Sequence, residues 1–254
     1  MSAVPESFWA ELPLGRGVTL LAHDANGMGA FDKPAGVLSH PNAGGDEPRS
    51  LLTVRYMMEG EYFQWTAVKG GPLLKLWLLN RLDSATSGVV LVAADEKLAQ
   101  EIRAQFKRKQ VRKVYQALVF GAPRPPVELW KDTLAVVRKG GQVRAALGTG
   151  RVPAETKMSL VQTGRSEPRV SLLRLEPHTG RSHQLRAQCA KRGMPIVGDQ
   201  TYGNFPRNRE FAKGVKTKRM FLHSLETGFE YEFGGKVQRF AASAPLPAEF
   251  TAAL

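Results

Sequence analysis

The segment Asn80-Arg81-Leu82-Asp83-Ser84-Ala85-Thr86-Ser87-Gly88 runs directly into the apolar stretch Val-Val-Leu-Val-Ala at residues 89–93. β-Branched and apolar residues in such a run are typical of a buried strand, and a turn that rests on a buried strand can hold a side chain rigidly. Side chains two residues apart point to the same side of an extended chain, so Arg81 and Asp83 should share one side. An isolated Arg-x-Asp is more often a surface ion pair.

The charge of the chain is unusual for a soluble globular protein. Of 254 residues, 43% are hydrophobic and 23% are charged, which is ordinary, but the formal net charge is +13. An excess of Lys and Arg attracts polyanions, of which nucleic acid is the most common. The composition therefore predicts a polyanionic partner.

The sequence also excludes several classes of protein. Cys189 is the only cysteine, so an internal disulfide and a Cys-based zinc site are both excluded. No apolar run approaches the length of a membrane-spanning helix, and the pattern of a signal peptide is absent. A soluble, cytoplasmic protein without a membrane partner is expected.

The order of the expected elements predicts an α+β fold with a largely antiparallel sheet. Residues 1–16 read as an N-terminal arm and residues 17–254 as one domain. The other expectations are a short helix at residues 50–58, a helix that Asp95 caps, a helix at residues 182–193 with Ser182 as N-cap, a basic loop at residues 205–219, and a hairpin with its turn at Gly234-Gly235.

Several motifs stand in a fixed order along the chain, at residues 80–93, 113–119 and 179–186. In this order they resemble the His-Arg-Leu-Asp-x-x-Thr-Ser-Gly signature, the Lys-x-Tyr-x-Ala strand and the Thr-Gly-Arg-x-His-Gln-Ile-Arg segment of the RluA-like pseudouridine synthases. Weaker similarities to the same family occur, in the expected order, at Asp32-Lys33-Pro34-Ala35-Gly36, Pro195-Ile196-Val197-Gly198-Asp199, Tyr202-Gly203 and Ser243-Ala244-Pro245-Leu246-Pro247. Together, all these motifs cover roughly residues 17–250.

The resemblance implies a curved mixed sheet with flanking helices and a central catalytic cleft. It also implies an isomerase that converts uridine to pseudouridine in ribosomal or transfer RNA, without a cofactor or a metal ion. By the same resemblance Asp83 is the catalytic carboxylate, Arg181 the cation that keeps it charged, and Tyr115 the aromatic residue that packs on the target base. A monomer is expected.

Further residues are expected to contact the RNA. Arg81 matches the family residue that enters the space left by a flipped base, and a guanidinium suits this role because it stacks on bases and reaches phosphates. Leu222 matches an apolar residue near the uracil. Backbone phosphates are expected to meet basic side chains of the outer helix face and of the basic loop, namely Arg186, Lys216, Lys218 and Arg219.

Two departures and two alternatives qualify this interpretation. Asn80 stands where the signature has histidine, and Gln188 stands where the family often has histidine. The main alternative is a catalytically silent RNA-binding or ribosome-assembly protein on the same fold. A two-carboxylate glycosidase needs a second acid, for which Asp199 is the remaining candidate.

Overall fold

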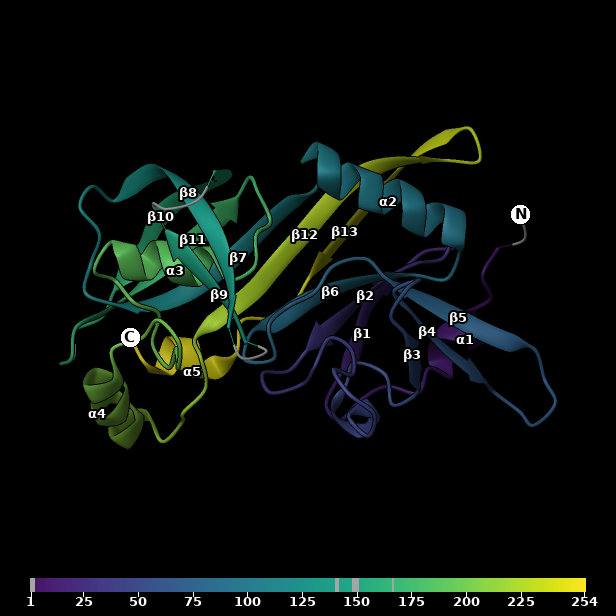
Figure 1. The fold of residues 1–254 in the computed structure, drawn as a ribbon, viewed down its shortest axis with the longest axis horizontal. Coiled ribbons are helices and arrows are strands. Elements are labelled where there is room, and N and C mark those ends of the chain that lie inside the picture. Colours follow the sequence, from purple (N-terminus) through teal and green to yellow (C-terminus); the bar gives the residue numbers. More distant parts are fainter. Residues whose placement is uncertain (1–2, 140–141, 148–150, 166) are drawn as a thin grey trace. The chain divides into compact units, whose positions relative to one another are not determined.

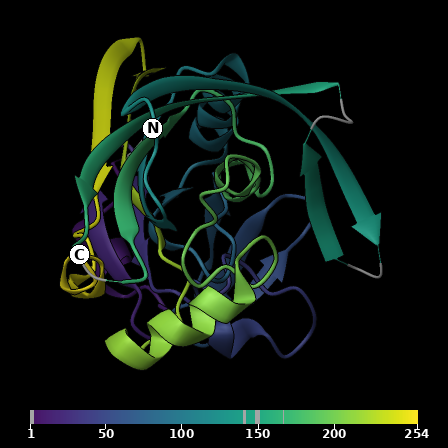
Figure 2. The ribbon, with the colours of Figure 1, turned by 90° about the vertical axis from the view of Figure 1, so that its left-hand side faces the viewer.

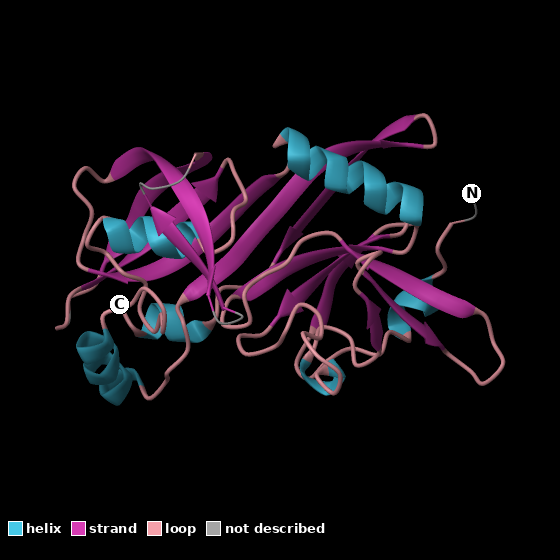
Figure 3. Cartoon of the chain, viewed as in Figure 1, coloured by secondary structure: helices cyan, strands magenta, loops and turns pink. Residues whose placement is uncertain are grey.

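The computed structural model of the protein describes residues 3–139, 142–147, 151–165 and 167–254, and most of its regular structure is strand (Figure 3). The chain divides into two compact units, which are considered separately (Figure 1). Unit 1 comprises Met1–Arg112 and Glu226–Ala244, and unit 2 comprises Lys113–Leu225 and Pro245–Leu254. The prediction of an α+β fold is confirmed.

Unit 1 is built on antiparallel strands. They are β1 (Thr19–His23), β2 (Met28–Lys33), β3 (Arg55–Met57), β4 (Tyr62–Thr66), β5 (Leu73–Leu78) and β6 (Ser87–Ala93). β6 pairs with β2 and with β5, and every residue of β6 is buried. The expectation of a buried strand after the Asp83 segment is therefore confirmed.

Helix α2 (Glu96–Arg108) covers part of the unit 1 core. Its N-cap is Asp95, whose side chain accepts a hydrogen bond from Leu98 N at 2.9 Å, as the sequence predicts. Leu98 and Ile102 pack in one hydrophobic cluster with strand β6 and with Phe229. Basic residues end the helix, where they suit the negative end of its dipole.

The hairpin at Gly234-Gly235 is also confirmed. It joins β12 (Leu222–Phe233), which belongs to unit 1 from Glu226 onward, to β13 (Lys236–Ser243). Phe233 pairs with Lys236, and both turn glycines have positive φ, which is the backbone of a two-residue hairpin turn.

Two short helices complete unit 1. They are α1 (Glu6–Ala10) and the 3-10 helix η1 (Glu47–Arg49). In α1, Trp9 is buried and stacks on His23. The N-terminal segment thus packs on unit 1, while the boundary at residue 17 stays a prediction.

Unit 2 contains an antiparallel sheet with the strand order β7-β11-β10-β8-β9. Its strands are β7 (Arg112–Phe120), β8 (Val127–Lys139), β9 (Gln142–Leu147), β10 (Val152–Thr163) and β11 (Val170–Pro177). Helix α3 (Gln184–Lys191) packs against β8 and β9, and Figure 2 shows it under the arching strands. Helices α4 (Phe205–Val215) and α5 (Ala248–Ala252) contribute Phe211 and Phe250 to a second core cluster.

Three expectations about elements are wrong or shifted. Residues 50–58 form no helix: Leu52 and Ser50 make isolated bridges to other segments, and β3 follows. Residues 205–219 are largely helical, because α4 spans most of them. Helix α3 has His183 rather than Ser182 as its N-cap residue.

The described residues contain no helix that is both long and apolar enough to cross a membrane.

Candidate functional site

Asp83 lies in the loop between β5 and β6, and the backbone around it is fixed by hydrogen bonds. Asp83 is half-buried. The backbone carbonyl oxygen of Asp83 accepts a hydrogen bond from Thr86 N at 2.9 Å, which closes a turn. The buried Ser39 hydroxyl donates to Leu82 O at 2.8 Å and accepts from Leu82 N at 3.0 Å. Both backbone groups of the residue before Asp83 are thus held by one side chain.

A buried lysine holds the other side of this loop. Lys33 has 0% exposure, and its Nζ donates to Ser84 O at 3.2 Å, to Val37 O at 2.7 Å and to Pro34 O at 3.1 Å. Gly36 N also donates to Ser84 O, at 2.7 Å. Because a buried cation needs such partners, the Lys33 segment and the Asp83 loop hold each other in place.

We expect Lys33→Met to destabilise unit 1 and to slow any reaction that uses Asp83. The substitution leaves partly buried carbonyl oxygens short of a donor, which costs about 1–3 kcal/mol. Urea denaturation and single-turnover kinetics on the same preparation measure the two effects. Lys97→Met on α2, where the lysine is exposed, is the matched control. Unchanged stability and turnover in Lys33→Met would show that the loop does not depend on this ammonium group.

Two other residues of the same loop, Asn80 and Arg81, make different kinds of contact. Asn80 Oδ1 accepts from Leu91 N at 2.7 Å, so the residue that replaces the signature histidine ties the loop to β6. Arg81 is exposed, and its guanidinium pairs with Glu61 at 2.9 Å. Arg103 approaches the same carboxylate at 3.6 Å. An exposed ion pair of this kind contributes little, so Arg81 can exchange Glu61 for another anion.

The other predicted catalytic residues belong to unit 2. Tyr115 lies on β7, opposite Leu175 of β11, and is half-buried. Arg181 is exposed in the segment between β11 and α3, and Leu222 is buried at the start of β12. Asp83 and Arg81 thus belong to unit 1, and Tyr115, Arg181 and Leu222 belong to unit 2; the pairing of Asp83 with Arg181 stays a prediction.

A buried glutamine organises the segment that carries Arg181. Gln184 Oε1 accepts from Arg181 N at 3.1 Å and from Thr179 Oγ1 at 2.7 Å. Its Nε2 donates to Glu155 O at 3.1 Å and to Thr156 Oγ1 at 3.0 Å. The amide group therefore connects both ends of the Thr179–Arg181 turn to strand β10.

Gln188 continues this network away from the Arg181 segment. Its Oε1 accepts from Thr156 Oγ1 at 2.7 Å, and its Nε2 donates to Asp132 Oδ2 at 2.9 Å. Asp132 also accepts from Lys191 and Arg192, and these hydrogen bonds hold the pKa of Asp132 below its usual value against the opposing effect of burial. The second departure from the family motif is thus fully buried and hydrogen-bonded.

The expectation that Arg186 faces outward is wrong. Its side chain is buried, and it donates to both carboxylate oxygens of Asp199, at 2.7 and 2.8 Å, and to Thr201 Oγ1 at 3.0 Å. Asp199 has 0% exposure and also accepts from Thr201 N and Tyr202 N. Arg186 is therefore occupied inside unit 2, and Asp199 is unsuited to be the second acid of a glycosidase.

Three of the residues predicted to contact RNA, Lys216, Lys218 and Arg219, lie directly after helix α4, and they differ in solvent exposure. Lys216 and Lys218 are exposed, as an RNA contact requires. Arg219 is half-buried, and its guanidinium lies over the Phe250 ring at 5.2 Å from the ring centroid. The exposed side of α4 carries additional basic residues, Arg209 and Lys213.

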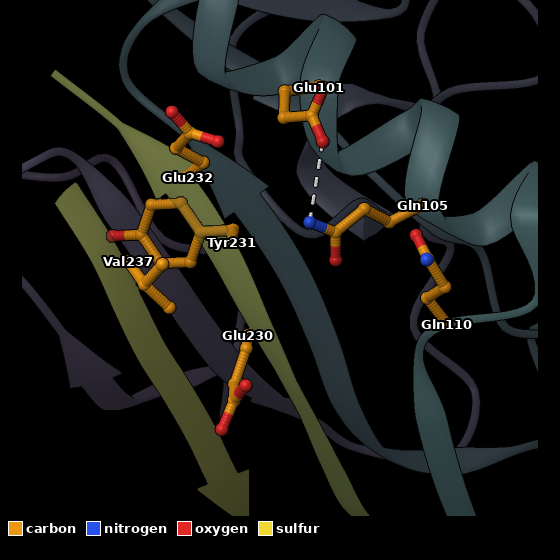
Figure 4. A pocket seen from close by; sticks show the side chains of 7 residues that line it. All are labelled: Glu101, Gln105, Gln110, Glu230, Tyr231, Glu232 and Val237. Atoms are coloured by element: carbon orange, nitrogen blue, oxygen red, sulfur yellow. Dashed lines mark hydrogen bonds between the residues drawn. The ribbon is translucent and has the colours of Figure 1, made fainter. Parts of the chain in front are cut away.

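A pocket of about 500 Å³ in unit 1 involves none of the predicted residues (Figure 4). It lies between α2 and the β12–β13 hairpin, where Gln105 Nε2 donates to Glu101 Oε1 at 3.4 Å. Glu101, Glu230 and Glu232 all line it. These carboxylates would repel RNA phosphates, so this pocket does not fit a polyanion.

Sequence reasoning did not assign a role to Lys33, Ser39, Gln184 or Lys113. Lys33 gave a weak signal: it ends a strand whose other residues, apart from Asp32, are apolar or glycine, and a lysine buried there needs an internal partner. Gln184 and Lys113 stand in the quoted motifs, but a motif alone does not say what a side chain contacts.

Comparisons with known proteins all find pseudouridine synthases. The family model described as RNA pseudouridylate synthase matches residues 29–191. A protein of Chloroflexus aurantiacus described as an uncharacterized RNA pseudouridine synthase is 33% identical over 218 residues, which are 86% of this chain and 63% of that protein. This chain thus spans less than two thirds of that relative.

Two further relatives have more of their length covered. The tRNA pseudouridine synthase C of Vibrio cholerae is 29% identical over 80% of this chain and 82% of its own length. An uncharacterized RNA pseudouridine synthase of Mycobacterium bovis is 30% identical over 94% of this chain and 72% of its own length.

Two solved structures share the fold. The human RNA pseudouridylate synthase domain containing 4 has a TM-score of 0.65 and 21% identity, over 92% of this chain and 91% of its own. The human RNA pseudouridylate synthase domain containing 1 has a TM-score of 0.68 and 22% identity, over 93% and 87%. At such identities the likeness concerns the fold alone.

Proposed function

The chain belongs to the RNA pseudouridylate synthase family, and from this premise we propose that it isomerises uridine to pseudouridine in RNA with Asp83 as the catalytic carboxylate. The observation that carries the proposal is the rigid loop that presents Asp83, because Lys33 and Ser39 fix the backbone on both sides of it. A carboxylate held in this way is suited to act at one defined atom.

The reaction needs few chemical groups. The bond between ribose C1′ and uracil N1 breaks, the base turns, and C1′ joins to C5. The proton leaves C5 and N1 gains one, so atoms and electrons balance without a cofactor. A carboxylate can serve as nucleophile at the sugar or the base, or as the base that removes a proton.

We assign supporting roles to three further residues. Arg181 keeps Asp83 charged by a charge-assisted pair, and the hydrogen bond from Arg181 N to Gln184 supports this role because it fixes the Arg181 backbone. Tyr115 packs on the target base. Leu222, which is buried at the start of β12, closes the apolar side of the base pocket.

The target uridine is flipped out of its stack, which costs a few kcal/mol of unstacking. We propose that Arg81 enters the vacated space. Its exposed guanidinium forms an exposed ion pair with Glu61, and Arg81 can leave that partner at little cost. RNA phosphate groups then offer stronger anionic partners than a solvent-exposed glutamate.

Helix α4 and the residues after it provide the phosphate-binding surface in this proposal. We expect replacing Lys213, Lys216 and Lys218 together with Gln to weaken RNA binding and to lower the slope of log affinity against log salt by about 2 to 3, at 0.7–0.9 for each lost contact. Arg219 is left in place because it packs on Phe250. Filter binding at several salt concentrations measures the slope, with Lys236→Gln at the hairpin turn as control. An unchanged slope would place the RNA surface elsewhere.

The activity itself is tested by tritium release from RNA labelled at uridine C5. The Vibrio relative is named for tRNA, so total tRNA and ribosomal RNA from cells that lack this gene are the two substrates to compare. Release from one of them supports the proposal and identifies the RNA class. Binding without release from either RNA would favour the alternative of a catalytically silent RNA-binding protein. A cytoplasmic location, where both RNAs occur, stays a prediction.

A further inference from the structure

Lys113 lies beside the segment that carries Arg181, at the start of strand β7. Side chains two residues apart on a strand share a face, so Lys113 and Tyr115 point to the same side of β7. The other end of the lysine reaches Gly180, where an added Cβ would lie 3.7 Å from Lys113 Nζ. The ammonium group thus lies beside the backbone that precedes Arg181, and the Lys113 side chain starts from the same face of β7 as Tyr115.

The environment of this ammonium group is unfavourable for a charge. The Lys113 side chain is half-buried, and burial lowers its pKa from 10.5 to about 8. Within the described residues, neither a hydrogen bond nor an ion pair is found for its Nζ. Titratable residues on these elements include Arg112 and Tyr115 on β7, and His178, Arg181 and His183 in and beside the Arg181 segment. The cause of the lowered pKa of Lys113 is burial.

Folding alone gives no reason for a lysine at this place. A partly desolvated cation without a partner costs stability, whereas a methionine of similar length would fill the space without that cost. Groups that destabilise a fold in this way are typical of functional sites, where a ligand supplies the missing partner. The missing partner of an ammonium group is an anion.

We propose that the Lys113 ammonium binds a phosphate of the RNA segment that carries the target uridine. The proposal rests on the proposed function, because it takes RNA as the ligand of the Tyr115 and Arg181 segment. A phosphate is favoured over a uracil carbonyl because only a full negative charge compensates the desolvation of the cation. The surface cations of α4 bind phosphates in water, whereas Lys113 would bind one in a partly dehydrated place.

The test compares Lys113→Met, Lys113→Arg and the control Lys236→Met with total tRNA and ribosomal RNA as probes. We expect Lys113→Met to bind severalfold more weakly and to lose roughly 0.7 to 0.9 from the salt slope, the value of one phosphate contact. Lys113→Arg should keep the slope. An unchanged slope in Lys113→Met would overturn the proposal, and it would indicate a neutral partner such as a uracil carbonyl.

The pH dependence of binding gives a second readout. A phosphate favours the charged form and raises the pKa of Lys113, so binding above pH 8 requires uptake of a proton. RNA affinity of the unchanged protein should therefore fall between pH 7 and pH 9 more steeply than that of Lys113→Met. Equal pH profiles would contradict the proposal. These are binding measurements, so a protein that binds RNA through Lys113 but releases no tritium would refute only the proposed function.

Thermal unfolding tests the premise that the folded protein leaves the ammonium group without a partner. Between pH 8 and 10.5 the unfolded chain binds more protons at Lys113 than the folded chain, so stability rises with pH in this window. Lys113→Met lacks this effect. It should unfold at a higher temperature than the unchanged protein at pH 7, and the gap should close toward pH 10.5. A lower unfolding temperature at pH 7 would overturn the proposal.

Discussion

Replacing Asp83 with Asn is expected to reduce pseudouridine formation by at least about a thousandfold, while RNA affinity stays within a few-fold. The substitution keeps the shape of the side chain and removes its negative charge, on which attack or proton removal depends. The loop should persist, because Lys33 and Ser39 hold it through backbone groups of Ser84 and Leu82, which the substitution leaves unchanged. Single-turnover kinetics and filter binding on the same RNA separate the two effects.

Glu59→Gln is a matched control, because Glu59 is an exposed carboxylate in the same unit. It undergoes the same change from carboxylate to amide and should turn over normally. If Asp83→Asn lost RNA binding in proportion to activity, the carboxylate would be needed for binding and not for chemistry. Retained turnover in Asp83→Asn would refute its catalytic role altogether.

The segment around Asp83 was largely predictable, because its strand signal is local. A run of β-branched residues predicts a buried strand, and β6 is buried along its whole length. The support of the loop was not predictable. Lys33 is far from Ser84 in sequence, and only the folded chain places the ammonium group against the Ser84 carbonyl. Local patterns do not encode such tertiary contacts.

Helices α3 and α4 show two different reasons for error. Residues Gln184–Cys189 of α3 are all buried, so this part of the helix has no exposed face for periodicity to identify, and the sequence pattern wrongly predicts an outward Arg186. Helix α4 buries Asn208 together with Phe211, and a polar residue on the buried face hides the apolar period. A usable signal existed for α4, since Asn204 caps it and a proline stands in its first turn.

Arg186→Met is expected to destabilise the protein by about 3–5 kcal/mol, the usual effect of removing one partner of a buried ion pair. Asp199 would keep its charge at 0% exposure, and its remaining donors among the described residues would be the backbone groups Thr201 N and Tyr202 N. The change should lower the urea midpoint strongly at pH 7. The double variant Arg186→Met with Asp199→Asn should be more stable than Arg186→Met alone, because the uncompensated charge is gone.

The stability lost in Arg186→Met should depend on pH, and the direction of this dependence follows from the pKa of Asp199. The Arg186 guanidinium and the two backbone donors hold the pKa of Asp199 below its usual value although burial opposes them. A carboxyl group with a lowered pKa stabilises the fold above its unfolded pKa of about 3.9, and this stabilisation is lost as the pH falls through the folded value. The difference between the unchanged protein and Arg186→Met should therefore be largest near neutral pH and should shrink in acid. Two results together would contradict this account: a small difference in stability at pH 7 between the unchanged protein and Arg186→Met, and a lower salt slope for RNA binding by the folded variant. They would indicate that Arg186 contacts RNA.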